Sequence, residues 1–287
     1  MPIAPERIRA VFAKLERDLL KLSTERRPER VHSFRTGTRR LQTLLEDLLP
    51  DRDRNQKKLL KLLLRVRKRA GRVRDLDVQL AALRSLKTPQ EPRRKTQLMH
   101  SLIEFHGEQD RKLRKVLTKE TVREIHKRLR RASKELNLDS GRDPLAVAKH
   151  LLEQAPRPEG APSEELLHQH RILTKRARYT AEFAAQSPQA EEFIAQLRRV
   201  QDALGDWHDW LMLTQSATHR LGDLPHSSLL AVLRNITGAK SRRAMATLST
   251  SVSTQASSAL AVAPQQTGSR KRGVNTSLAS VRTPSAA

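Results

Sequence analysis

Cysteine is absent from the 287 residues of this sequence, and so is any long apolar run. Without cysteine, the chain can form neither disulfide bonds nor thiolate metal sites. No uncharged apolar stretch approaches the roughly 20 residues of a membrane-spanning helix. The N-terminal segment MPIAPERIRAVFAKLERDLL carries charges where a signal peptide needs its apolar core. We therefore expect a cytoplasmic protein.

Aromatic residues are scarce, and the common catalytic motifs are missing. The chain has one Tyr, two Trp and five Phe, whereas proteins that read single-stranded bases usually stack them on aromatic side chains. The motifs G-x-x-x-x-G-K-[ST], G-x-G-x-x-G, H-E-x-x-H and G-x-S-x-G do not occur. These absences argue against base recognition and favour a protein that is not an enzyme and needs no cofactor.

Positive charge is what the sequence has in excess. It contains 56 Lys and Arg against 31 Asp and Glu, a net charge of +25. The segment from Ser249 to the end holds four of the cations and no acid, so the first 248 residues keep +21. A folded body this basic repels itself unless a polyanion neutralises it. The candidate partners are nucleic acid, an anionic membrane and an inorganic polyanion.

Helical periodicity dominates, and no convincing alternating strand pattern is present. The pattern predicts helices over about 5–24, 29–49, 54–87, 92–119, 120–136, 143–154, 163–186, 188–221 and 225–247. The breaks between several of them are rich in Pro, Gly and Asp. The region 137–163 divides residues 1–248 into two helical halves, about 1–137 and 143–248.

The last 39 residues, 249–287, differ in composition from the rest. Fourteen of them are Ser or Thr, with Ala and Gln between. Such a segment cannot bury enough apolar surface to order itself. We therefore expect a disordered C-terminal tail.

Two sequence motifs of the first half recur in the second. VHSFRTGTRR (31–40) matches LHQHRILTKR (167–176) at an offset of 136 residues. AGRVRDLD (70–77) resembles ALGDWHDW (203–210) at an offset of 134. Two motifs in the same order with nearly equal offsets indicate a duplicated helical unit.

The first motif places polar side chains on one face of each helix. In the first half this face carries His32, Arg35, Arg39, Gln42 and Glu46. In the second half the equivalent positions carry His168, Arg171, Lys175, Arg178 and Glu182. Each stripe forms a basic ridge about 20 Å long. Most charge runs are only solvated faces, but the repetition of this one, histidine included, favours a binding surface.

The second motif supplies four aspartates, Asp75, Asp77, Asp206 and Asp209. Carboxylates can hold Mg²⁺, which makes hydrolysis of a phosphate compound one alternative. Because Arg72 and Arg74 stand beside Asp75, ion pairing that fixes the arginines is the simpler interpretation. We favour ion pairing. An enzyme that hydrolyses a phosphate compound with Mg²⁺ is the less supported alternative.

Four ordered segments resemble the CHAD domain, a helical domain named for its histidines: VHSFRTGTRR, GRVRDLDV, LHQHRILTKRARY and LRRVQDALGDWHD. The resemblance covers about residues 5–247. It implies an all-α fold of two four-helix bundles related by pseudo-twofold symmetry, with a basic cleft between them. Gln42 departs from the pattern, since the family more often has a basic residue there, and this predicts a weaker contact in the first half.

The resemblance also implies binding of inorganic polyphosphate and association with polyphosphate granules. Guanidinium and ammonium groups can hold a phosphate chain through charge-assisted hydrogen bonds. We predict twelve polyphosphate-binding residues: His32, Arg35, Arg39, Arg40, Lys68, Arg72, Arg74, His168, Arg171, Lys175, Arg176 and Arg178. No catalytic residue, metal, cofactor or membrane partner is predicted. The alternative partner is nucleic acid, bound through its backbone without sequence specificity, and the sequence does not predict the oligomeric state.

Overall fold

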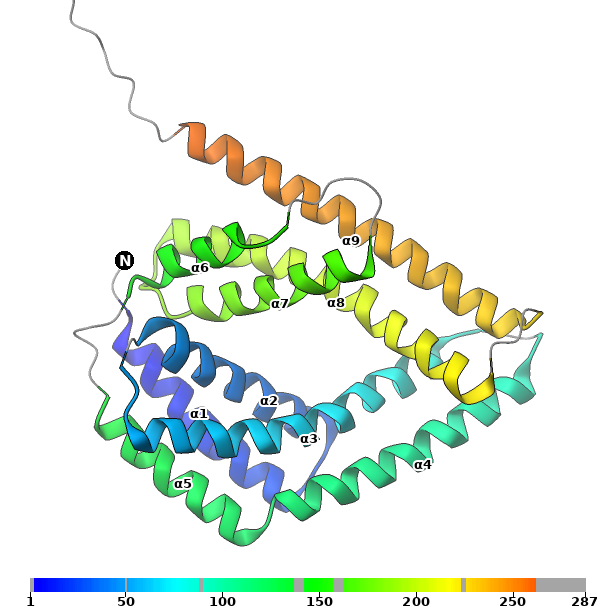
Figure 1. Ribbon diagram of the computed structural model, residues 1–287, viewed down its shortest axis with the longest axis horizontal. Coiled ribbons are helices and arrows are strands. Elements are labelled where there is room, and N and C mark those ends of the chain that lie inside the picture. The colour runs from blue at the N-terminus through cyan, green and yellow to red at the C-terminus, as the bar shows by residue number, and fades with distance from the viewer. Residues whose placement is uncertain are drawn as a thin grey trace, which may run out of the picture. The chain divides into compact units, whose positions relative to one another are not determined.

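The computed structural model describes residues 3–49, 51–87, 90–136, 142–156, 163–222 and 226–261, with side chains as far as Ser251. The described residues form nine α-helices and one short π-helix (Figure 1). The α-helices are α1 (Pro5–Thr24), α2 (Pro28–Thr43), α3 (Arg54–Ser85), α4 (Pro92–Val116), α5 (Lys119–Lys134), α6 (Pro144–Glu153), α7 (Glu164–Ala181), α8 (Pro188–Leu221) and α9 (Ser228–Ala261). Within these ranges there is no strand, only an isolated bridge between Ile3 and Ala184. The all-α prediction is confirmed.

Proline and short polar side chains define where the helices begin. Proline occupies the first turn of α1, α2, α4, α6 and α8, where its missing N–H leaves no partner unsatisfied. Side-chain oxygens also cap the first turns of α3, α5, α6, α7 and α8 by accepting hydrogen bonds from backbone N–H groups. These capping residues are Asp53, Thr118, Asp143, Ser163 and Ser187.

The helices that carry the two copies of the first motif both end in a distortion that the sequence did not predict. The helix that begins with α2 finishes as the π-helix, Leu44–Leu48, which contains Glu46. Its counterpart α7 ends at Ala181 instead of near 186, so Glu182 lies in a turn. The last position of each predicted stripe therefore leaves regular α-helical geometry, and the two glutamates do not continue the basic ridges.

Helix α9 extends further than the sequence predicted. It was expected to end near 247, yet it continues to Ala261 and so includes the first residues of the predicted disordered tail. No Gly or Pro occurs between 239 and 263, and alanine favours the helix. The remainder of that tail, 262–287, lies outside the described residues.

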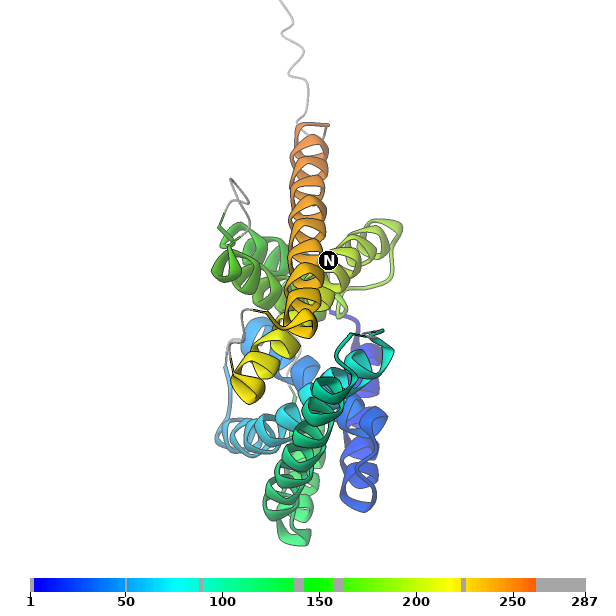
Figure 2. The same cartoon turned by 90° about the vertical axis from the view of Figure 1, so that its right-hand side faces the viewer.

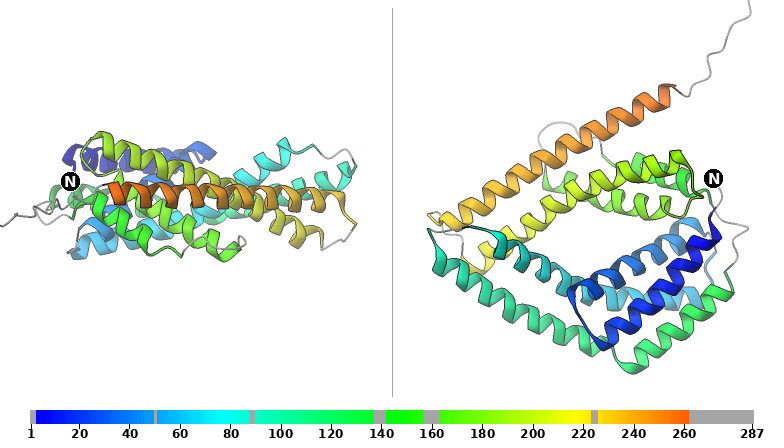
Figure 3. Two further views of the ribbon diagram at one scale, coloured as in Figure 1. Left: turned by 90° about the horizontal axis from the view of Figure 1, so that it is seen from above. Right: turned by 180° about the vertical axis from the view of Figure 1, so that it is seen from behind.

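The first half packs around one large apolar core. Leucines, valines and phenylalanines from α1, α2, α3 and α5 are buried together in it. Phe183, from the turn after α7, completes this core and so ties the second half to the first. Figures 2 and 3 show the same four helices grouped together from other directions.

Residues 1–251 form one compact unit. Outside the first-half core, smaller apolar cores hold this unit together. One lies among α6, α7 and the start of α8, and another among α7, α8 and α9. A third joins the two halves where the far ends of α3 and α8 meet α4 and the start of α9.

The pseudo-twofold pairing of two bundles remains a prediction. Among the described helices, none is both long enough and apolar enough to cross a membrane.

Candidate functional site

The helices that carry the repeated motifs lie against one another in the structure. α2 contacts α7, and α3 contacts α8 (Figure 1). This packing brings cations of both halves into mutual electrostatic interaction. We call them the central basic cluster: Arg35, Arg39, Arg67 and Arg74 from the first half, and Arg171 and Lys175 from the second.

Arg35 occupies the first-half side of the central basic cluster. Its guanidinium Nη1 lies 3.4 Å from Oδ1 of Asp75, so Asp75 does form an ion pair, but with Arg35 of the other motif and not with its sequence neighbours. Burial lowers the pKa of Arg35, and the charges of Arg39 and Arg74 lower it further, while Asp75 opposes them. Aspartate therefore positions the arginine, but it does not cancel the positive charge around it.

Lys175 is the most strongly perturbed cation of the cluster. Loss of hydration, followed by repulsion from Arg171 and Arg39, lowers its pKa to about 7. Asp209 opposes the shift, and Arg35 adds to it. Within the described part of the chain, Lys175 makes neither a hydrogen bond nor an ion pair with a side chain. Its ammonium is held among like charges without a protein counterion in contact.

The two motif histidines lie at the exposed edge of the cluster. Partial loss of hydration lowers the pKa of His32, and Arg74 and Arg35 contribute to the shift. His168 faces the ring of His208, with 6.0 Å between the ring centroids. Burial, together with Arg171 and Lys175, lowers the pKa of His208 to about 3, so this histidine is neutral at physiological pH.

Three of the four aspartates of the second motif have separate ion-pair partners. Asp75 pairs with Arg35, Asp77 with His106 at 2.9 Å, and Asp206 with Lys240 at 2.9 Å. Burial raises the pKa of Asp209, and the nearby cations Arg171 and Lys175 oppose that shift. In the ranges that the structure describes, no group of three or more His, Asp or Glu side chains is arranged to hold a metal ion.

Arg67 belongs to the cluster although the sequence did not single it out. Burial and the charges of Arg39 and Arg35 lower its pKa to about 10. It lines a pocket of about 460 Å³ together with Arg35, Arg39, Leu64, Lys68, Gly71, Arg72 and Asp75. Its guanidinium donates a hydrogen bond to the side-chain oxygen of Gln42. Arg67 therefore brings a positive charge from α3 to Gln42, the position where the family more often has a basic residue.

The second half contains the same pair with the two residue types exchanged. At the offsets of the repeat, Gln42 corresponds to Arg178, and Arg67 corresponds to Gln201. Arg178 donates from Nε to the side-chain oxygen of Gln201 at 2.7 Å. In each half, a hydrogen bond between one arginine and one glutamine thus connects the two helices that carry the motifs. Aligning the two copies at both positions is the sequence signal that would have found Arg67.

Besides Arg35, three of the twelve predicted ligands form ion pairs, two of which join the halves. Arg40 donates to Oε2 of Glu182 at 2.8 Å, and Arg176 holds the buried Asp47 with two nitrogens. Asp47 raises the pKa of Arg176. Arg178 is buried beside the same Glu182. These contacts place Arg40 and Arg176 in the interface between the halves and Arg178 beside Glu182, so all three arginines are paired outside the central basic cluster.

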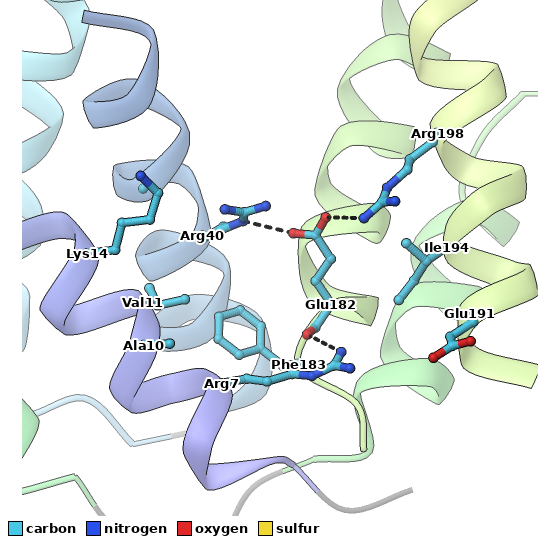
Figure 4. A pocket seen from close by; sticks show the side chains of 11 residues that line it. Arg7, Ala10, Val11, Lys14, Arg40, Glu182, Phe183, Glu191, Ile194 and Arg198 are labelled. Carbon is cyan, nitrogen blue, oxygen red and sulfur yellow. Dashed lines mark hydrogen bonds and ion pairs between the residues drawn. The ribbon is translucent and has the colours of Figure 1, made fainter. Parts of the chain in front are cut away.

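Glu182 also lies at a second pocket, of about 600 Å³, between α1, α2 and the start of α8. Figure 4 shows the side chains of Arg40 and Arg198 directed at its carboxylate, while Arg7 donates to its backbone oxygen at 2.9 Å. Ile194 and Phe183 form part of the wall. The acid is thus engaged by arginines from both halves, which fits a structural role.

The other nine predicted ligands lie in or beside the central basic cluster: His32, Arg35, Arg39, Lys68, Arg72, Arg74, His168, Arg171 and Lys175. Lys68 and Arg72 are exposed where they line the pocket on α3. The assignment of these nine residues as polyphosphate ligands stays a prediction, but the structure brings them together from three helices, α2, α3 and α7.

Comparison with known proteins agrees with this architecture. A model of the CHAD domain family matches residues 6–218. The crystal structure of the CHAD domain from the plant Ricinus communis superposes with a TM-score of 0.57 at 18% sequence identity, over 82% of this chain and 83% of that one. At this identity the similarity shows the fold alone. A comparison with curated proteins gave no match. Since the family model spans most of the sequence and its motifs line the central basic cluster, this chain belongs to the CHAD domain family.

Proposed function

We propose that the chain binds inorganic polyphosphate at the central basic cluster, catalyses no reaction on it, and is thereby directed to polyphosphate granules in the cytoplasm. The family to which the chain belongs is associated with polyphosphate binding. The observation that carries the proposal is the convergence of cations from both repeats, Arg35 and Arg39 with Arg171 and Lys175.

The electrostatics of the free protein support a polyanion as the partner. The cluster contains six cations, and the acids that act on them include Asp75, Asp209 and Glu46. The lowered pKa values of Lys175 and Arg67 mean that their charged forms are under strain in the free protein. A bound anion relieves this repulsion, so charge that destabilises the free protein becomes favourable in the complex.

The chemistry of the side chains favours a simple phosphate chain over a nucleic acid. Arginine forks can hold phosphate oxygens bidentately without reading any other feature of the ligand. Base stacking needs exposed aromatic rings, whereas Tyr179 and Trp207, the aromatic residues beside the cluster, are buried. Neither of these two rings is therefore available to stack on a base.

Competition binding tests the proposal. Labelled long-chain polyphosphate is displaced with unlabelled polyphosphate, duplex DNA or single-stranded RNA at matched phosphate concentrations. We expect polyphosphate to compete best. Equal competition by the nucleic acids would make the chain a general binder of phosphate backbones. Release of inorganic phosphate that depends on Mg²⁺ would contradict the non-enzymatic part of the proposal.

A further inference from the structure

Helix α3 has an unusual charge distribution that its counterpart does not share. From Arg54 to Arg74 it contains ten Lys or Arg residues and no Asp or Glu. The corresponding segment of α8, residues 188–208 at the offset of the second motif, contains two Arg and four acidic residues. The repeat preserves the motif residues but not this charge, so the excess on α3 is a property of the first half alone.

Six of these cations form a continuous exposed row. They are Arg54, Lys58, Lys61, Arg65, Lys68 and Arg72, and we call them the α3 cationic track. Their spacing alternates between four and three residues, which places all six on one face of the helix. At about 1.5 Å per residue, the track is about 27 Å long. Among the described residues, none of the six forms an ion pair with an acid.

The track leads directly into the central basic cluster. Its last two members, Lys68 and Arg72, line the pocket that Arg35, Arg39 and Arg67 also line. At the positions equivalent to the track, α8 carries Pro188, Glu192, Ala195, Arg199, Asp202 and Asp206. A chain of phosphates that occupies the cluster therefore meets further positive charge along α3, and mainly negative charge along α8.

A row of unpaired like charges on one helix face opposes folding. Like charges at a spacing of four residues on a helix are destabilising. No acid on α3 offsets this repulsion between Asp53 and Asp75. A linear polyanion that follows the row would neutralise these charges in succession.

We propose that a polyphosphate chain leaves the central basic cluster along the α3 cationic track, toward the N-terminal end of α3. This inference rests on the proposed function, because it assumes that the cluster holds the chain. It makes binding directional and dependent on chain length. A short chain fills the cluster alone, whereas a long chain also covers the track.

The test compares two triple variants of equal charge change. The track variant carries Lys58→Gln, Lys61→Gln and Arg65→Gln. The control variant carries Lys127→Gln, Arg130→Gln and Lys134→Gln on α5. Both triplets contain two lysines and one arginine, share the same spacing, and are exposed. The α5 triplet contributes no residue to the pocket at the cluster.

The probes are tripolyphosphate and a polyphosphate several tens of phosphates long, measured by calorimetry over a range of salt concentrations. For the long chain, loss of three neutralised phosphates should make the log–log salt slope of the track variant about 2 units shallower. If the proteins bind equally at 1 M salt, that slope corresponds to an affinity about 100-fold weaker at 0.1 M. The control should bind the long chain within a few-fold of the unmodified protein, and tripolyphosphate affinity should be the same for all three proteins.

Each other outcome overturns the inference in a recognisable way. Equal weakening by both triplets would mean that the long chain responds to net charge and follows no path on α3. An unchanged track variant would mean that the chain leaves the cluster elsewhere, with the proposed function intact. If the unmodified protein binds neither probe, the proposed function fails together with the inference. Circular dichroism checks that both variants remain helical.

Discussion

Lys175 should be the group that couples polyphosphate binding to pH. Its pKa is lowered to about 7 in the free protein by lost hydration and by the charges of Arg171 and Arg39. A phosphate chain beside it favours the charged ammonium and raises the pKa again. Binding should therefore take up a proton. At pH 8 a group with a pKa of about 7 is only about one-tenth protonated, so uptake should be about 0.9 proton per protein.

The same shift sets an upper limit on the change in affinity with pH. If the bound chain restores the ordinary pKa of 10.5, affinity should fall by at most about 50-fold between pH 7 and pH 9. His208 does not contribute, because its pKa of about 3 keeps it neutral throughout. Below pH 7 the dependence should weaken, since Lys175 is already charged in the free protein.

The stability of the ligand-free protein should change with pH in the direction opposite to its affinity for polyphosphate. Between pH 7 and 10.5 the unfolded chain carries a proton on Lys175 that the folded chain has lost. Wherever the unfolded state binds more protons, the free energy of unfolding rises with pH. The contribution of Lys175 therefore stabilises the ligand-free fold as pH rises through this window, while affinity for polyphosphate falls.

Calorimetric titration with long-chain polyphosphate, at pH 8 in buffers of different ionisation enthalpy, measures the uptake directly. Lys175→Gln keeps a hydrogen-bond donor but cannot gain charge, and it should abolish the uptake. A double variant, His32→Gln with His168→Gln, should retain most of it. If Lys175→Gln takes up as many protons as the unmodified protein, or if the histidine variant takes up none, Lys175 is not the coupling group.

Three further measurements probe the cluster and its surroundings. If the six cations of the central basic cluster each neutralise a phosphate, the log–log salt slope should be roughly −4 or steeper, and a flat dependence would contradict the cluster as the binding site. Arg176→Ala leaves the buried Asp47 without its partner; because Arg176 is itself 45% exposed, we expect the free energy of unfolding by urea to fall by about 2 kcal/mol, with polyphosphate affinity nearly unchanged. The opposite result, weaker binding at constant stability, would make Arg176 a ligand. Arg35→Ala with Arg39→Ala should weaken binding without loss of helical content, and a loss of helix measured by circular dichroism would make these arginines structural.

The helices and the repeat were predictable because they follow from local rules. Apolar periodicity, proline at first turns and the capping residues Ser163 and Ser187 act within a few residues of the chain. The two offsets, 136 and 134, identified the duplicated motifs without any structure. The pairing of Asp75 with an arginine was also predicted, although the partner is Arg35 of another helix and not one of its sequence neighbours.

The division of the predicted ligands into two groups could not be read from the sequence. Arg39 and Arg40 are adjacent, yet Arg39 lies in the central basic cluster, whereas Arg40 pairs with Glu182 across the halves. Adjacent residues on a helix point about 100° apart, so the packing partner of each face decides its role. Arg67 was missed for a related reason, since its position in the cluster depends on how α3 packs against α2.

The central claim is that the two repeats form one polyphosphate site. The stoichiometry of a short polyphosphate, measured by calorimetric titration of the unmodified protein and of the two half-site variants, tests it most directly. One variant carries Arg35→Ala and Arg39→Ala, and the other carries Arg171→Ala and Lys175→Ala. We expect one chain per protein, and each variant alone should weaken that single event. Two chains per protein, with each variant removing one and leaving the other at full affinity, would show two independent sites and contradict the account.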